Sequence, residues 1–239
     1  MFIYNGFSQT PTRNFQAAGI DFFIPNIDDN NLEQVAIAKE ALKKSYKLSD
    51  NDIETFWITV DGLATTEQAQ IIQNNRWNLL HLFYALKSAT WFQDHREESF
   101  TRKVDYFLDE YLRVSNDGKI GIACKFSDMV FINSGVKVAL EPYKCLEFKN
   151  KSGKGVAGWS VKACLVDEDY SGYMHLSMQY LWYDSENGGT IYVGDKLTQG
   201  VKYTTETDDA IELTQEEYDE KMKNSQRGSD GFGSSDVQH

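Results

Sequence analysis

The sequence pattern of the chain changes abruptly near residue 117, and this change limits the folds open to it. No glycine occurs between Gly62 and Gly118, and residues 27–116 are rich in helix formers and helix-capping signals. Residues 117–239 instead hold short β-like runs separated by glycine-containing turns. We therefore predict a helical block that is inserted in a mainly β chain.

Several signals within residues 27–116 predict individual helices. Residues 32–46 are rich in Ala, Glu, Lys and Leu, Ser49 is placed to begin a second helix, and Thr65 with Gln68 matches a capping box. Apolar residues then follow at spacings of 7, 8, 11 and 14, which predicts one helix face built from Ile72, Leu79, Leu80, Phe83 and Leu86. We interpret the aromatic residues of this zone as its core: Trp57, Trp77, Phe83, Tyr84, Trp91 and Phe92.

The clearest strand signal lies in residues 173–183. Apolar and polar side chains alternate there, which predicts a strand with one buried face formed by Met174, Leu176, Met178, Tyr180 and Trp182. Shorter β runs at 136–140, 190–193 and 201–204 are bounded by turns. Many short strands of this kind predict an antiparallel barrel or jelly roll. Near the end, Thr214 with Glu217 matches another capping box.

Composition excludes several classes of function. The chain has 239 residues with 24 Lys+Arg against 36 Asp+Glu, a net charge of −12 that argues against nucleic-acid or anionic-membrane partners. The most apolar stretch, 79–92, is short and interrupted by polar residues, and no signal-peptide pattern is present. The three cysteines form no C-x-x-C pair, and the four histidines have no metal-ligand spacing. We expect a cytoplasmic protein.

Four segments carry side chains suited to phosphate chemistry. Five lysines fall between residues 144 and 162, around the sequence NKSGKG, where backbone N–H groups and an ammonium suit a phosphate. Asp167 follows two apolar residues in LVDEDYSGY and is placed to orient a water. GDKLTQ ends in an amide, and RGSDGFGSS surrounds one phenylalanine with an arginine, serines and glycines. Taken singly, each also fits a solvated turn or a mobile terminus.

Together, five segments resemble the five ordered motifs of the homotrimeric dUTPase family: AAGID (17–21), SGVKVALEPYKCLEFKNKSGKG (134–155), LVDEDYSG (165–172), GDKLTQ (194–199) and RGSDGFGSS (227–235). The resemblance implies a mainly β, jelly-roll or β-clip subunit with an inserted α-helical block, α+β overall. It divides the chain into a β domain (1–26 plus 117–223), the helical insertion (27–116) and a flexible active-site tail (224–239). It covers none of the insertion.

The resemblance also implies an activity and a set of site residues. The reaction is hydrolysis of dUTP to dUMP and pyrophosphate with Mg²⁺, in a homotrimer whose active sites are shared between subunits. Asp167 activates the water, Tyr170 packs beneath the deoxyribose, and Asp21 lies near the water shell of the metal. The remaining substrate contacts implied are Lys151, Ser152, Gly153, Gln199, Arg227, Phe232, Gly233, Ser234 and Ser235.

The sequence departs from the family pattern at two places. Asn150-Lys151-Ser152 stands where the family usually has Pro-Arg-Ser, and a lysine lacks the bidentate fork of arginine. No asparagine occurs between Ser152 and Asp167, where the family commonly uses one beside the base. The base preference therefore stays open, as do a pyrophosphatase or deaminase for another pyrimidine deoxynucleotide. An interaction protein that binds a partner through residues 27–116 is a further alternative.

Overall fold

The computed structural model describes residues 1–14, 16–163, 165–183, 189–205 and 214–223. The chain divides into two units, Met1–Thr205 and Glu206–His239. In the second unit the described element is helix α8 (Gln215–Met222), which begins at the predicted capping box of Thr214 and Glu217. All three sheets and the other helices belong to the first unit.

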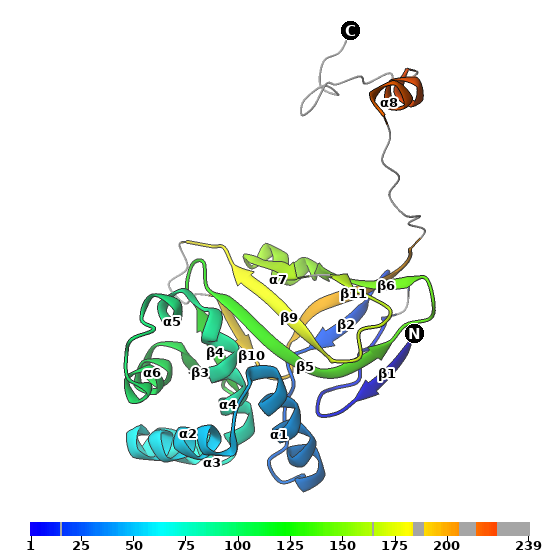
Figure 1. Ribbon diagram of the computed structural model, residues 1–239. Helices are drawn as coiled ribbons and strands as arrows, with labels where there is room; N and C mark the ends of the chain where they lie inside the picture. Colours follow the sequence, from blue (N-terminus) through cyan, green and yellow to red (C-terminus); the bar gives the residue numbers. More distant parts are fainter. Residues whose placement is uncertain (15, 164, 184–188, 206–213, 224–239) are drawn as a thin grey trace. The chain divides into compact units, whose positions relative to one another are not determined.

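In the described part of the first unit, the strands form three antiparallel sheets (Figure 1). One has the strand order β1 (Phe2–Asn5), β5 (Met129–Ala139), β9 (Tyr173–Tyr180) and β7 (Trp159–Ala163). A second has the order β2 (Ile20–Phe23), β11 (Lys196–Thr204), β6 (Lys144–Asn150) and β8 (Leu165–Val166). The third has the order β10 (Gly189–Tyr192), β4 (Ile120–Cys124) and β3 (Leu112–Val114).

Strand β9 confirms the predicted alternation over most of its length. Its apolar face is buried in the core through Met174, Leu176, Met178 and Tyr180. The prediction for Trp182 was wrong, because this side chain is 55% exposed. Pairing with β7 ends at Tyr180, and Trp182 instead lies over Gly158, where an added Cβ would come within 2.9 Å of the Trp182 Cβ.

The helices follow β2 and precede β3. They are α1 (Leu32–Tyr46), α2 (Asp50–Leu63), α3 (Thr66–Gln73), α4 (Arg76–Ala85), the 3₁₀ turn η1 (Leu86–Ser88), α5 (Thr90–Asp94), α6 (Phe100–Tyr106) and the π-helical η2 (Phe107–Tyr111). The predicted capping box at Thr65 begins α3, and α2 begins after Ser49 as predicted, with a capping box to Asp52 that was not part of the prediction. The predicted architecture of a β fold with an inserted helical block is thus confirmed.

The single helix predicted over Ile72–Leu86 was wrong, because the chain breaks between α3 and α4. The Asn75 side-chain amide donates to the Ile71 carbonyl (3.0 Å) at the end of α3. The Asp29 carboxylate then accepts the N–H groups of Arg76 (2.5 Å) and Trp77 (3.3 Å), which caps α4 from a distant loop. The apolar spacing therefore continues across two helices.

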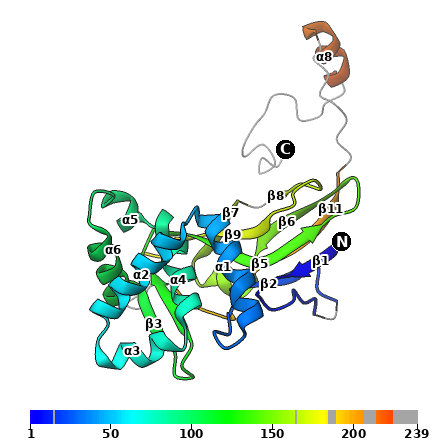
Figure 2. The same cartoon turned by 60° about the horizontal axis from the view of Figure 1, so that its bottom comes forward.

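The helical block and the sheets share one core. Helices α2–α6 lie together beside the sheets (Figures 1 and 2), while α1 and α4 pack against β5. The Tyr46 hydroxyl donates to the Phe131 carbonyl (3.0 Å), and the Asn78 side chain bonds both the N–H (2.7 Å) and the carbonyl (2.9 Å) of Ile27. Among the described helices, none has the length and apolar character needed to cross a membrane.

Candidate active site

One group of predicted site residues lies where β2, β11 and β6 run side by side. Gln199 of β11 is paired with Asp21 on β2 and with Lys149 on β6. The Lys151 ammonium lies 3.0 Å from one carboxylate oxygen of Asp21, and the Lys196 ammonium lies 2.9 Å from the other. The sheet thus brings together residues from three of the family-like segments.

The Asp21 carboxylate is buried, and two ammonium groups face it. Burial raises the pKa of Asp21, but hydrogen bonds and charges from Lys196 and Lys151 outweigh it, and the net pKa is lowered. Asp21 is therefore ionised at neutral pH. Two cations against one carboxylate leave a net positive charge at this end of the sheet.

The NKSGKG sequence forms a single helical turn, α7 (Ser152–Val156), directly after β6. Ser152 and Gly153 are exposed, and a Cβ added at Gly153 would meet no atom within 4 Å. The Lys154 ammonium is 2.8 Å from the Asp195 carboxylate, which ties this turn to the GDKLTQ segment. The Gln199 amide donates to the Asn150 carbonyl (3.3 Å) at its start. Ser152 and Gly153 therefore border the lysine–carboxylate group.

A second group surrounds Asp167, which directly follows β8. Asp167 and Tyr170 line a cavity of about 210 Å³. The Tyr170 N–H donates to the Asp167 carbonyl (3.2 Å), and the Tyr170 hydroxyl donates to the Tyr173 carbonyl (2.9 Å). Gly172 makes this ring position possible, because a Cβ there would lie 2.5 Å from the Tyr170 hydroxyl. The turn thus fixes the aromatic ring beside the carboxylate-bearing segment.

Two further residues of this cavity, Phe131 and His175, were not predicted from the sequence. Their rings are stacked, with centroids 4.4 Å apart and planes 6° from parallel. Burial lowers the pKa of His175 to about 4, although a hydrogen bond with the Tyr173 backbone acts to raise it. The ring is therefore neutral at pH 7. Both residues, with Tyr170, also line an adjoining cavity of about 360 Å³. The alternation of β9 places His175 on the face opposite Met174, but the sequence carried no signal for its partner on β5.

Lys196 is a further residue that the sequence analysis did not single out. It lies within the GDKLTQ segment, and its ammonium is one of the two that hold Asp21. The segment itself was the available signal. Its lysine was overlooked because nothing local shows that β11 runs beside β2.

The two groups lie at opposite ends of β6 within one chain. Val166, which precedes Asp167, is paired with Leu146 near the start of β6, whereas Thr198 is paired with Asn150 at its end. The four steps along the strand from Leu146 to Asn150 span about 13 Å at about 3.3 Å per residue. One chain therefore does not bring Asp167 to Ser152 and Gln199.

The remaining predicted residues are Arg227, Phe232, Gly233, Ser234 and Ser235, and they lie outside the described residues. In the described part of the chain, no three His, Cys, Asp or Glu side chains form a group that would hold a metal ion. Both oxygens of the Asp21 carboxylate face lysines, so its indirect metal contact stays a prediction.

The sequence matches no protein-family profile and no curated protein. Solved structures that are similar to parts of the chain include a mutant dUTPase of staphylococcal bacteriophage 80alpha with dUpNHpp. It is 18% identical with a TM-score of 0.42, and the match covers 49% of this chain and 81% of that one. The EIAV dUTPase is 16% identical with a TM-score of 0.32, and the match covers 44% of this chain and 92% of the EIAV chain.

A mutant dUTPase from phage phi11 of S. aureus is a third such structure. It is 15% identical with a TM-score of 0.35, the match covers 39% of this chain and 76% of that one, and it is described with a structural Mg(II) ion. All three of these solved structures are dUTPases.

Proposed function

We propose that the protein is a dUTP diphosphatase, which hydrolyses dUTP to dUMP and pyrophosphate. The observation that carries the proposal is the cavity of about 210 Å³ lined by both Asp167 and Tyr170 at the end of β8. A carboxylate beside a fixed aromatic ring suits a water nucleophile next to a sugar. The five sequence segments point to the same activity.

In this reaction Asp167 orients a water molecule and accepts its proton. The water oxygen attacks the α-phosphorus, and the bond from that phosphorus to the bridging oxygen breaks. Pyrophosphate leaves with the bonding electron pair. Phosphoryl chemistry of this kind depends mainly on positioning and on neutralising charge, so one carboxylate base suffices.

Tyr170 is proposed to select the deoxyribose. Its hydroxyl is held by the Tyr173 carbonyl at 2.9 Å, so the ring cannot turn away freely from the cavity that it lines. A ribose packed on a fixed ring has no room for a 2′-hydroxyl. The stacked Phe131 and His175 rings extend the same wall.

The phosphate chain is proposed to bind at the other end of β6. The Ser152 hydroxyl and the Gly153 N–H would take phosphate oxygens, with Gln199 and Lys151 beside them. Three observations support this assignment: the exposure of Ser152 and Gly153, the open space at Gly153 and the net positive charge around Asp21.

The separation of the two groups supports active sites that are shared between chains, and the assembly proposed is a homotrimer. Because Asp167 and Ser152 lie at opposite ends of β6, a complete site needs Asp167 from one chain and the phosphate-binding group from another. A cyclic assembly makes the same contact between every pair of neighbouring chains. We propose three such sites in each trimer.

The tail and the metal complete the proposal. Arg227, Ser234 and Ser235 would reach the γ-phosphate, and Phe232 with Gly233 would cover the base. The substrate is the magnesium complex of dUTP, in which the triphosphate itself holds the ion. Asp21 would contact the water shell of that ion once a water molecule replaces one of its two lysine partners.

The test is pyrophosphate release with Mg²⁺ from dUTP, UTP, dTTP and dCTP in parallel, with ammonia measured in the same samples. We expect fast release from dUTP, no ammonia, and a loss of about a thousandfold or more in Asp167→Asn. Release of ammonia from dCTP would identify a deaminase instead. No release from any of the four nucleotides would contradict the proposal.

A further inference from the structure

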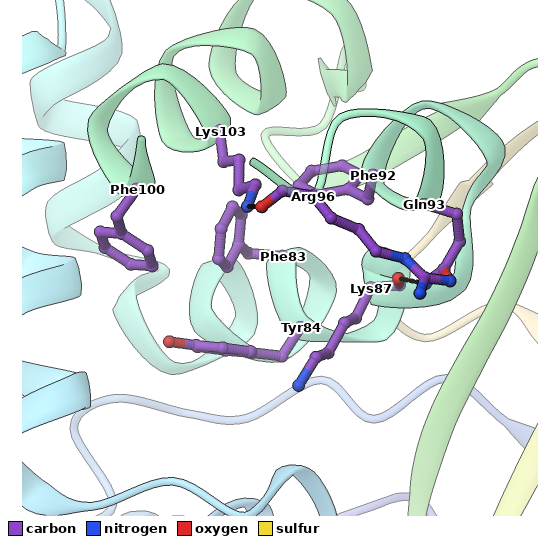
Figure 3. A pocket seen from close by; sticks show the side chains of 8 residues that line it. All are labelled: Phe83, Tyr84, Lys87, Phe92, Gln93, Arg96, Phe100 and Lys103. Carbon is purple, nitrogen blue, oxygen red and sulfur yellow. Dashed lines mark hydrogen bonds between the residues drawn. The ribbon is translucent and has the colours of Figure 1, made fainter. Parts of the chain in front are cut away.

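A separate cavity of about 590 Å³ opens within the helical block and contains none of the family-like segments. Its walls are aromatic: Phe83 and Tyr84 come from α4, Phe92 from α5 and Phe100 from α6 (Figure 3). The Phe83 ring lies edge-on to Phe92 and to Phe100, with centroids 5.7 and 5.9 Å apart. The cavity is therefore a mainly apolar hollow with aromatic walls.

Three cations border this apolar hollow. They are Lys87 on η1, Arg96 in the loop after α5 and Lys103 on α6. None of the lining residues is acidic, although the whole chain has 36 acidic against 24 basic residues. Within the described ranges, no carboxylate lies within ion-pair distance of any of the three. This cavity is thus bordered by positive charge, although the net charge of the whole chain is negative.

Hydrogen bonds hold this rim in position (Figure 3). The Lys103 ammonium donates to the Arg96 carbonyl at 2.6 Å, and the Arg96 guanidinium donates to the Gln93 side-chain oxygen. The Gln93 amide in turn donates to the Lys87 carbonyl at 2.6 Å. A rim that is ordered before a ligand arrives loses less conformational entropy on binding.

The Asp52 carboxylate on α2 interacts electrostatically with Lys87 but does not form an ion pair with it. It caps its own helix by accepting from the Ser49 N–H at 2.7 Å and from the Ser49 hydroxyl at 2.6 Å. Burial and the charge of Asp52 raise the pKa of Tyr84 to about 12, so its hydroxyl stays protonated at pH 7. The cavity therefore offers positive charge and a neutral donor.

We propose that this cavity binds an amphipathic organic anion, whose apolar body lies against the four aromatic rings and whose carboxylate or phosphate pairs with Lys87, Arg96 and Lys103. The volume is within the range of small-molecule sites, about 300–1,000 Å³. A neutral apolar ligand would bury the cations without a counter-charge, and a bare inorganic anion would leave the aromatic walls in water. This site is independent of the proposed hydrolysis.

The test is calorimetric titration of the full chain with 1-naphthyl phosphate, 1-naphthol and inorganic phosphate. We expect 1-naphthyl phosphate to bind about tenfold or more tightly than either of the others. The double variant Lys87→Gln/Arg96→Gln should weaken its binding about tenfold. The charge-matched control Lys39→Gln/Arg102→Gln should change nothing, because these residues pair with Asp50 and Asp105 away from the cavity.

Two further variants separate this site from the proposed active site. Phe100→Ala should weaken the binding of 1-naphthyl phosphate but not that of inorganic phosphate, while Ser152→Ala/Gln199→Ala, which alters the proposed phosphate site of the hydrolysis, should bind 1-naphthyl phosphate as the unaltered chain does. The double variant should still hydrolyse dUTP. Equal affinity for 1-naphthol, unchanged binding in the double variant, or no binding at millimolar ligand would each overturn the proposal.

Discussion

The Lys151 ammonium donates a 3.0 Å hydrogen bond to the buried carboxylate of Asp21, although 130 residues separate the two in the sequence. Lys196 holds the second carboxylate oxygen at 2.9 Å. The group joins β2, β11 and the end of β6, and it fixes the Lys151 side chain before any ligand is bound. Its charge is therefore part of both the fold and the proposed phosphate site.

Asp21→Asn is expected to lower the free energy of unfolding by about 1–3 kcal/mol at pH 7, because two ammonium groups lose their charged partner. Burial raises the pKa of Asp21, but the two lysines lower it by a larger amount. The pKa in the folded state therefore lies below the ordinary value of 3.8. The contribution of the carboxylate is then complete above about pH 4 and is lost as the pH falls through the lowered pKa.

Urea unfolding of both proteins at pH 7 and pH 3 measures this effect. The difference in unfolding free energy between the unaltered chain and Asp21→Asn should be full at pH 7 and smaller at pH 3. A difference of the same size at both pH values would show that the charge of Asp21 is not the cause.

His81 and His175 are expected to make the fold less stable in mild acid. Burial lowers the pKa of His81 to about 3 and that of His175 to about 4, each from an ordinary value of 6.5. Between about pH 6.5 and pH 4 the unfolded chain binds protons that the folded chain does not, so stability falls as the pH falls. Each histidine contributes a slope of about 1.4 kcal/mol per pH unit.

The pH dependence of urea unfolding between pH 7 and pH 4.5 checks this expectation. His81→Leu removes one of the two groups and should reduce the slope by about half. A slope equal in the unaltered chain and in His81→Leu would contradict the assignment.

Tyr170 is expected to govern the discrimination between deoxyribose and ribose. Tyr170→Ala opens the cavity wall, so the preference for dUTP over UTP in kcat/KM should fall by about 10–100-fold. Tyr170→Phe keeps the ring and loses only the bond to the Tyr173 carbonyl, so it should retain most of the preference. Parallel assays of pyrophosphate release from dUTP and UTP measure this preference. If it is unaltered in Tyr170→Ala, Tyr170 does not select the deoxyribose.

The buried Asp128 is expected to hold the helical block onto the sheets. Its carboxylate accepts from the Tyr111 hydroxyl (2.9 Å) and from the N–H groups of Thr90 (2.9 Å) and Lys125 (2.7 Å). Asp128→Ala leaves three donors without a partner and should cost about 3 kcal/mol or more, whereas Tyr111→Phe should cost about 1 kcal/mol. Urea unfolding checks both values, and a loss in Asp128→Ala as small as in the exposed Asp94→Ala would contradict this expectation.

Features determined by neighbouring residues could be predicted from the sequence. The capping boxes at Thr65 and Thr214 need only four residues each, and the structure has both. The alternation of β9 reports one buried face because neighbouring side chains of a strand point to opposite sides. Such signals located the helical block and the sheets.

Features determined by distant contacts could not be predicted in the same way. The break between α3 and α4 depends on Asp29, which lies 47 residues before Arg76. Trp182 leaves the core because its strand loses its partner at Tyr180. The stack of Phe131 on His175 and the contact of Lys196 with Asp21 likewise depend on which strands become neighbours. Local spacing contains no information about these partners.

Mixing two inactive variants tests whether a complete site combines Asp167 from one chain with the phosphate-binding group of another. Asp167→Asn and Ser152→Ala/Gln199→Ala should each lose nearly all activity. When equal amounts are unfolded together and refolded, about one quarter of the sites in random trimers should pair the two intact halves. About a quarter of the activity of the unaltered protein should then be recovered. No recovery, in mixtures shown to form mixed trimers, would place both halves of the site in a single chain and contradict the shared site.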